Sequence, residues 1–269
     1  MKIPKSSLLV PMLIIAIFAG VMYALVRDNQ EPKVEAPIVT EDNKPSAPVD
    51  MSLVEEKTYK KVTQYAVFDV TYPQFKNVSN ELNERIGNLV DKGIENHIVD
   101  SAENWRARYD TRQPGDDIAE FPADDQKFQF SMSWKPIQLN NNFVSTLITF
   151  GGYTGGAHGY QNMVSYNYDV IGKKDMTLAD LFPGNPNYLK TVSEFSRKDL
   201  TAQFRDRLEI DSKADIDPGI MDMLIAGTEP TVENFRVFTF TGDSITLYFT
   251  QYQVAPYAMG ESTVKMPRK

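Results

Sequence analysis

An uncharged, apolar run near the start of the chain constrains its fold more than any other feature. Residues 6–26 carry no charged side chain and consist mostly of Leu, Ile, Val, Met, Ala and Phe, which is sufficient for a helix that crosses a bilayer. Lys2 and Lys5 precede the run and no acidic residue does. Because short basic flanks stay in the cytoplasm, we expect residues 1–5 to be a cytoplasmic tip, residues 6–26 a transmembrane signal anchor, and the rest to lie outside.

A signal peptide that is removed by cleavage is the alternative interpretation of the same run. The pairs Ala19-Gly20 and Tyr23-Ala24 supply small residues, but the run exceeds the usual length of about 7–15 apolar residues in such signals and no clear cleavage motif closes it. The anchor therefore predicts a single-pass protein of the cell membrane, and cleavage would instead yield a secreted protein.

The composition narrows the classes of partner. The chain has no cysteine, and its 36 Asp and Glu outnumber its 28 Lys and Arg, so the exported part must be held together by an ordinary hydrophobic core without disulfides. An acidic surface disfavours nucleic acid and anionic lipid and suits a cationic protein or peptide. The excess of acids also fits the simpler interpretation that it keeps the domain soluble.

The pattern after the apolar run predicts a stalk followed by two halves of a folded region. Residues 27–50 contain four prolines, mixed charges and no aromatic residue, which is typical of a disordered, extended stalk. We expect residues 51–172 and 173–269 to form the N-terminal and C-terminal halves of the folded part.

Hydrophobic periodicity in this region predicts an α+β fold. Alternation indicates strands at 66–72, 128–134, 143–150, 164–170, 235–240 and 245–253, whereas spacing of three and four indicates helices at 76–104 and from about 186 to 209. A third helix is expected at 217–227, with Asp217 as its N-cap before Pro218 and Gly227 at its end. Pro73 is expected to end the first of these strands, and the three asparagines at 140–142 are expected to form a hairpin turn into the strand at 143–150. Hairpins outnumber crossovers in this order, so we expect an antiparallel sheet packed by helices.

Few residues suit catalysis or metal binding. His97 and His158 are the only histidines, and neither a zinc motif nor a nucleophile elbow is present. His97 lies at the edge of the first helix's apolar stripe, which predicts a boundary histidine without a functional role. The acids at 211, 215 and 217 lack the spacing of a calcium loop. The sequence therefore predicts no catalytic residue, no metal and no cofactor, and it indicates no oligomeric state.

The most distinctive segment is the string FGGYTGGAHGYQ at residues 150–161. Five glycines in nine positions carry a high entropic cost, so a random loop would not be expected to contain them. One interpretation is a strained hairpin turn; the other is a surface where bare backbone lets a partner approach. On the second interpretation the binding residues are Tyr153, Gly155, Gly156, His158 and Tyr160.

Several spaced motifs together carry a resemblance to a known family. They are YTGGAHGY at 153–160, IGK at 171–173, LADLF at 178–182 and YQVAPYAMG at 252–260. In this pattern the chain resembles the extracytoplasmic domain pair of PdaC-type peptidoglycan deacetylases and RsiV-type anti-sigma factors, over about residues 53–268.

The resemblance implies binding more than catalysis. In the deacetylases the chemistry lies in a separate domain with aspartate and metal-binding histidine pairs, a pattern that these 269 residues do not contain. In the anti-sigma factors the resembling domain binds lysozyme outside the cell, and a cytoplasmic segment, for which residues 1–5 leave little room, holds the sigma factor. We therefore expect an anchored envelope module that binds or senses a basic protein such as lysozyme, or a ligand related to peptidoglycan. A structural scaffold for a partner protein and an unrecognised peptidoglycan hydrolase are the alternatives.

Overall fold

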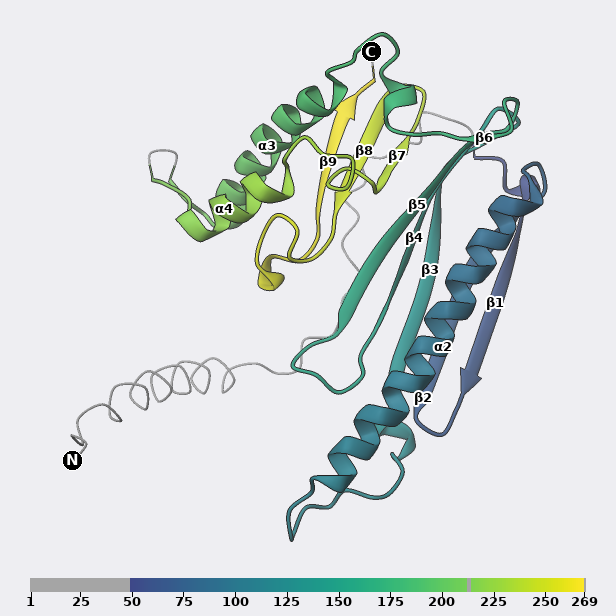
Figure 1. Ribbon diagram of the computed structural model, residues 1–269, viewed down its shortest axis with the longest axis vertical. Coiled ribbons are helices and arrows are strands. Elements are labelled where there is room, and N and C mark those ends of the chain that lie inside the picture. Colours follow the sequence, from purple (N-terminus) through teal and green to yellow (C-terminus); the bar gives the residue numbers. More distant parts are fainter. Residues whose placement is uncertain (1–48, 212–213, 269) are drawn as a thin grey trace, which may run out of the picture. The chain divides into compact units, whose positions relative to one another are not determined.

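The computed structural model describes residues 49–211 and 214–268 (Figure 1). The predicted cytoplasmic tip, signal anchor and nearly all of the stalk lie outside these residues and stay predictions. Within the described residues, no helix is both long enough and apolar enough to cross a membrane.

The described part of the chain folds into two sheets, with strand orders β1-β2-β3-β4-β5-β6 and β7-β8-β9. The strands are β1 (Val54–Val62), β2 (Ala66–Phe75), β3 (Phe128–Leu139), β4 (Phe143–Gly152), β5 (Tyr160–Asp169), β6 (Lys174–Asp175), β7 (Phe238–Phe240), β8 (Ser244–Phe249) and β9 (Ser262–Pro267). The α-helices are α2 (Asn80–Asp110), α3 (Tyr188–Arg207) and α4 (Pro218–Gly227), and the short 3₁₀ helices are η1 (Met51–Leu53), η2 (Asp124–Gln126), η3 (Ala179–Leu181) and η4 (Tyr257–Met259). The predicted α+β class is confirmed, whereas the expected antiparallel sheet is in fact two sheets.

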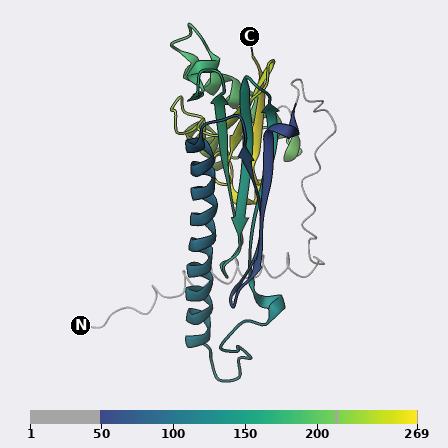
Figure 2. The ribbon, with the colours of Figure 1, turned by 90° about the vertical axis from the view of Figure 1, so that its right-hand side faces the viewer.

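One strand pair in the first sheet is parallel, which the sequence pattern did not predict. Helix α2 joins β2 to β3 and runs back along one face of the sheet, so β3 enters beside β2 in the same direction (Figure 2). A parallel pair needs such a long crossover connection. The other pairs in this sheet are antiparallel, including the expected hairpin between β3 and β4.

Pro73 does not end β2, contrary to the prediction. The strand continues to Phe75 because β3 pairs with β2 only as far as Val70. Beyond Val70 the side of β2 that faces β3 has no strand partner, and proline is tolerated there because no ladder hydrogen bond is lost. On its other side β2 pairs with β1 as far as Phe75, and β1 is the charged edge strand of the sheet, which the sequence pattern did not predict.

Helix α2 packs one stripe of side chains on the first sheet and extends past the predicted end at residue 104. Its buried residues, spaced four or seven apart, are Leu82, Ile86, Val90, His97, Ser101 and Trp105. Trp105 is buried and its Nε1 donates to the Ala119 carbonyl oxygen at 3.3 Å. Trp105 is therefore the residue through which the end of the helix packs on the rest of the domain, since most residues after it are exposed.

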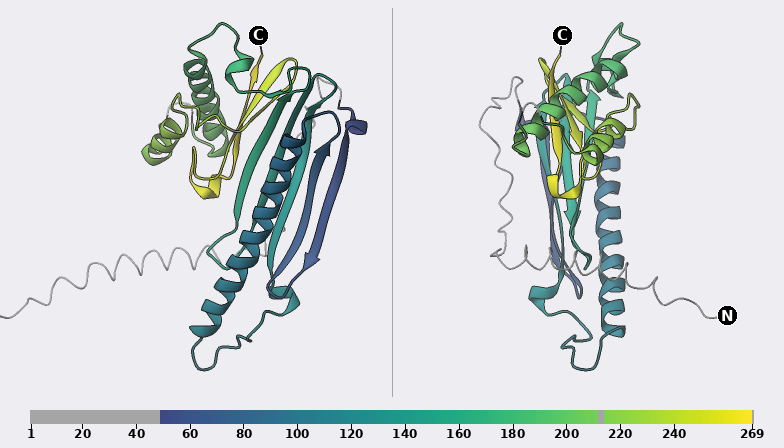
Figure 3. Two further views of the ribbon diagram at one scale, coloured as in Figure 1. Left: turned by 45° about the vertical axis from the view of Figure 1, so that its right-hand side comes forward. Right: turned by 90° about the vertical axis from the view of Figure 1, so that its left-hand side faces the viewer.

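The second sheet forms its own core with α3 and α4, which pack beside it (Figure 3). The Asp217 carboxylate accepts hydrogen bonds from the amides of Gly219 and Ile220, which confirms the predicted N-cap before Pro218. The last predicted strand ends early, at Phe249, and residues 250–253 form a turn that leads to the unpredicted β9.

Polar side chains of the first sheet form hydrogen bonds with the backbone of β7. Asn167 Nδ2 donates to the Phe238 carbonyl oxygen at 2.8 Å, and the Phe240 amide donates to Ser145 Oγ at 3.0 Å. Ser145 Oγ in turn donates to Asn167 Oδ1 at 2.7 Å, and the Phe238 amide donates to Ser165 Oγ at 3.1 Å. These bonds supply partners for backbone groups that would otherwise be buried without any.

Candidate binding site

The glycine-rich turn joins β4 to β5, and its first two glycines are required by close backbone approach. A Cβ atom on Gly151 would lie 2.2 Å from the Tyr160 carbonyl oxygen. On Gly152 it would lie 2.7 Å from the Gln129 carbonyl oxygen and 2.9 Å from the His97 ring. Both positions therefore exclude any side chain while the strands keep this register.

The next two glycines differ in what they require. Gly155 has φ +95° and sits against the Phe128 ring, so it adopts a backbone conformation that L side chains avoid. Gly156 lacks a positive φ, and the nearest atom to an added Cβ is the His158 carbonyl oxygen at 3.8 Å. The strained hairpin turn that was one interpretation of this segment therefore does not require a glycine at residue 156, since that position has room for a side chain.

The exposed side chain of His158 is held by two tyrosines from the second half of the chain. Its ring stacks on Tyr257, with centroids 3.9 Å apart, and its Nε2 lies 3.2 Å from the Tyr252 hydroxyl. On the other side of the ring, Nδ1 lies 2.8 Å from the carbonyl oxygen of Gly159, which also accepts a hydrogen bond from the Tyr257 hydroxyl at 3.2 Å. With Nδ1 donating to this carbonyl, Nε2 of the neutral ring accepts from Tyr252.

Tyr252 is a site residue that the sequence analysis missed. It has φ +65°, a left-handed conformation that is strained for a bulky residue, and its side chain is 54% exposed. The motif at residues 252–260, which carried part of the family resemblance, was the signal that could have found it. The alternation of residues 245–253 instead assigned Tyr252 to a strand.

Exposed aromatic side chains gather around this turn. Four aromatic residues are strongly exposed in the described part of the chain, and three of them, Tyr153, Tyr160 and Tyr252, belong to the turn or contact it. We use the name tyrosine–histidine patch for Tyr153, His158, Tyr160, Tyr252 and Tyr257. Of the five predicted binding residues, the three with side chains are thus exposed together, while Gly155 and Gly156 shape the backbone between them.

The hydroxyl groups of Tyr153 and Tyr160 each have a polar contact, one within the turn and the other with helix α2. The Tyr153 hydroxyl donates to the Gly156 carbonyl oxygen at 2.9 Å, and its ring packs edge-on against Phe128. The Tyr160 hydroxyl lies 3.5 Å from Nδ1 of His97, and burial raises the pKa of Tyr160. Each ring therefore keeps a defined position while exposing part of its surface.

His97 lies beneath the turn as a core residue, and the prediction of a boundary position is wrong. Its side chain is 0% exposed and sits between the rings of Phe68 and Phe130. Gly152 makes this burial possible, because any side chain there would meet the imidazole ring. Burial lowers the pKa of His97, and the Phe128 backbone carbonyl opposes this effect only in part.

Cationic side chains do not occur in the segments that build the patch. Neither residues 150–164 nor residues 250–264 contain Lys or Arg. The acid in these segments is Glu261, whose pKa is raised because burial disfavours its charged form. Within the described residues, no group of three or more His, Asp or Glu is arranged to hold a metal ion.

Comparison with protein families assigns the two parts of the patch to two domains. Residues 59–161 match the family described as "Deacetylase PdaC", and residues 179–269 match "Protein of unknown function (DUF3298)". The chain therefore carries the PdaC/RsiV-type domain pair, which confirms the predicted resemblance. The glycine-rich turn lies in the first domain, and Tyr252 and Tyr257 lie in the second.

One curated protein is similar over much of this chain. The peptidoglycan-N-acetylmuramic acid deacetylase PdaC of Bacillus subtilis (strain 168) is 26% identical over 178 residues. The match covers 65% of this chain but only 36% of that protein.

Two crystal structures of DUF3298 family proteins are also similar. One, from Bacteroides fragilis, gives a TM-score of 0.48 at 21% identity and covers 80% of this chain and 90% of its own. The other, from Pseudomonas aeruginosa, gives a TM-score of 0.47 at 18% identity and covers 80% of this chain and 88% of its own.

Proposed function

We propose that this chain is an extracytoplasmic binding module of the bacterial cell envelope and that the tyrosine–histidine patch is its contact surface. The observation that carries the proposal is the meeting of two family motifs in space: His158 of the PdaC domain is clamped by Tyr252 and Tyr257 of the DUF3298 domain. The left-handed backbone at Tyr252 supports it, because strained residues gather at ligand-binding sites.

The chemistry of the patch favours a basic protein, such as lysozyme, as the partner. Tyrosine faces attract Arg and Lys side chains, and tyrosine is enriched among residues that dominate protein interfaces. The segments that build the patch carry no competing cation. Glycine and tyrosine together also resemble the composition of antibody loops, in which rigid aromatic rings are displayed on adaptable backbone.

A binding role accounts for the patch better than a catalytic one. Both ring nitrogens of His158 face a backbone carbonyl or a tyrosine hydroxyl, and these partners orient the imidazole without activating it in the way that a carboxylate would. We further propose that residues 6–26 anchor the module in the membrane, with the folded part outside.

Lysozyme binding by the full chain tests the proposal. We expect Tyr252→Asn and His158→Ala to weaken binding by at least about 10-fold, since aromatic anchors in an interface commonly contribute 2 kcal/mol or more. Asparagine is chosen at residue 252 because it tolerates a left-handed backbone, so the ring is removed without added strain. Biolayer interferometry with immobilised chain measures the affinities.

The matched control is Phe121→Ala, which removes an exposed aromatic ring outside the patch. It should leave the affinity unchanged, and equal melting temperatures would show that all variants are folded. Unchanged lysozyme binding by folded Tyr252→Asn would refute the patch as the contact surface. Failure of the unaltered chain to bind lysozyme, together with retention of purified peptidoglycan fragments, would instead favour the wall ligand. Release of acetate or sugar from those fragments would show a hydrolase.

A further inference from the structure

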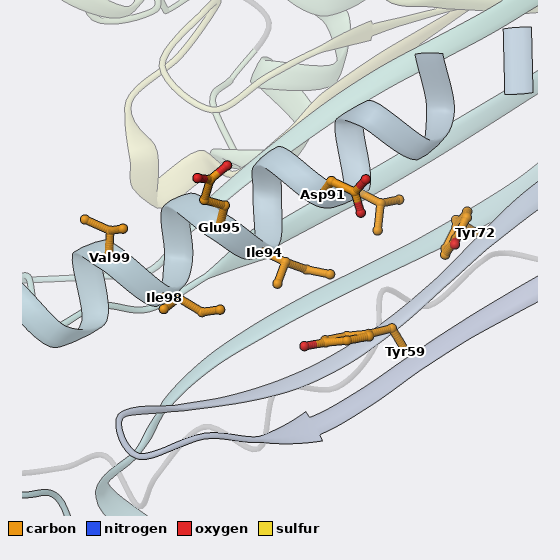
Figure 4. A pocket seen from close by; sticks show the side chains of 8 residues that line it. Tyr59, Tyr72, Asp91, Ile94, Glu95, Ile98 and Val99 are labelled. Atoms are coloured by element: carbon orange, nitrogen blue, oxygen red, sulfur yellow. The ribbon is translucent and has the colours of Figure 1, made fainter. Parts of the chain in front are cut away.

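A groove runs between α2 and the β1–β2 hairpin, away from the residues of the tyrosine–histidine patch. It has a volume of about 320 Å³. Figure 4 shows the α2 wall above the two strands, with Ile94 and Ile98 pointing toward Tyr59. The lining residues are Tyr59, Tyr72, Val90, Asp91, Ile94, Glu95, Ile98 and Val99. A groove of this size accepts one or two large side chains.

The α2 wall of the groove is more apolar than a solvated helix face requires. Ile98 and Val99 are 39% and 47% exposed, and Ile94 is only partly buried against the core. Branched side chains are weaker helix formers than the Lys, Glu or Ala that usually cover a wet face. These residues are therefore only partly packed in the core, and they are not the residues that best stabilise an exposed helix. This is expected where an apolar surface of another molecule packs against them.

The charged residues around the groove indicate the charge of the ligand that it would bind. Asp91 and Glu95 are exposed and one helical turn apart, a spacing at which like charges repel. No salt bridge joins either of them to a basic residue of the described chain. On the strand side, Lys57 is already paired with Glu55. The two charged residues that line the groove, Asp91 and Glu95, are therefore both acidic and without a salt bridge to the described residues.

We propose that this groove binds a segment of a partner polypeptide that places apolar side chains over Tyr59 and Ile98 and Lys or Arg beside Asp91 and Glu95. Apolar contact alone would admit many ligands, and the carboxylates select a basic amphipathic segment among them. Grooves that bind amphipathic helices work in the same way: apolar side chains on one face of the bound segment enter the groove, and charged residues at its rim pair with charges on the segment.

A fluorescein-labelled amphipathic peptide of Leu and Lys serves as the probe for the full chain, with fluorescence anisotropy as the readout. A Leu and Glu peptide of the same pattern tests charge, and a Ser and Lys peptide tests the apolar anchors. We expect only the Leu and Lys peptide to bind well. The double variant Asp91→Asn with Glu95→Gln should weaken it by about five-fold through the loss of two exposed ion pairs.

The matched control is the double variant Glu84→Gln with Glu103→Gln, which changes the net charge equally on exposed positions of the same helix outside the groove. It should leave peptide binding unchanged, whereas Ile98→Ser should weaken it by about five-fold or more. Equal losses in the two charge variants, or equal affinity for the Leu and Glu peptide, would overturn the proposal. Tyr252→Asn should have no effect on this probe, so the groove and the patch are tested separately.

Discussion

The buried ring of His97 is expected to make one contribution to the pH dependence of the domain's stability. Burial lowers its pKa below the ordinary value of 6.5, so the folded protein holds the ring neutral while the unfolded chain takes up a proton near pH 6.5. This contribution to stability is present above that pH and is lost as the pH falls, with a slope of at most about 1.4 kcal/mol per pH unit.

The variant His97→Gln tests this dependence. It removes the titrating ring, so the free energy of unfolding should fall less between pH 7 and pH 5 than it does in the unaltered chain. Urea denaturation at several pH values measures the slopes. The variant will also lose packing against Phe68 and Phe130, and the comparison therefore concerns the slope and not the absolute stability. Equal slopes in the two proteins would contradict the assignment of the pH dependence to His97.

At the scale of an element, the glycine-rich turn contains some glycines that the fold requires and others that it does not. Gly151→Ala should destabilise the domain by about 1–3 kcal/mol, because the new Cβ would meet the Tyr160 carbonyl and force the strands apart. Gly156→Ala should change the free energy of unfolding by less than about 1 kcal/mol, since the position is open. Thermal unfolding measures the stability of both variants. Equal destabilisation would show that the close approach of β4 and β5 does not require glycine at residue 151.

The elements that the sequence predicted are those whose signals are local. The N-cap at Asp217 and the turn at Asn140 depend on side chains that bond to backbone two or three residues away, so their position could be predicted without tertiary structure. The parallel pairing of β2 with β3 depends on the path of the chain through α2, which places the start of β3 beside β2. The edge strand β1 has many charged residues, so it lacks a clear alternation of apolar and polar residues. Such features are set by contacts between distant segments.

In the candidate site, too, the features with local signals could be predicted and those that depend on distant contacts could not. The glycine-rich string indicated Tyr153, His158 and Tyr160 directly, because five glycines in a short segment need an explanation within that segment. Tyr252 and Tyr257 could not be joined to His158 from sequence, because 94 or more residues separate them and only the folded chain brings the motifs together. The family pattern marked the second motif but not its contact with the first.

At the scale of the whole molecule, the patch can exist only while the two sheets stay docked, and Asn167 is a buried side chain that joins them. It is buried and bonds to both Ser145 and the Phe238 carbonyl. Replacing it by alanine leaves two buried polar groups without their partner, and each such group costs roughly 1–3 kcal/mol.

We therefore expect Asn167→Ala to destabilise the protein by about 2–4 kcal/mol, and to increase amide hydrogen exchange in β7 as well as in β4 and β5. Because His158 meets Tyr252 and Tyr257 across the same junction, lysozyme binding should weaken in this variant although no patch residue is changed. The control is Asn162→Ala, an exposed asparagine on the same strand, which should alter neither exchange nor binding. Faster exchange confined to β7–β9 with normal binding would mean that the patch forms without the Asn167 network, and that the two domains contribute to it independently.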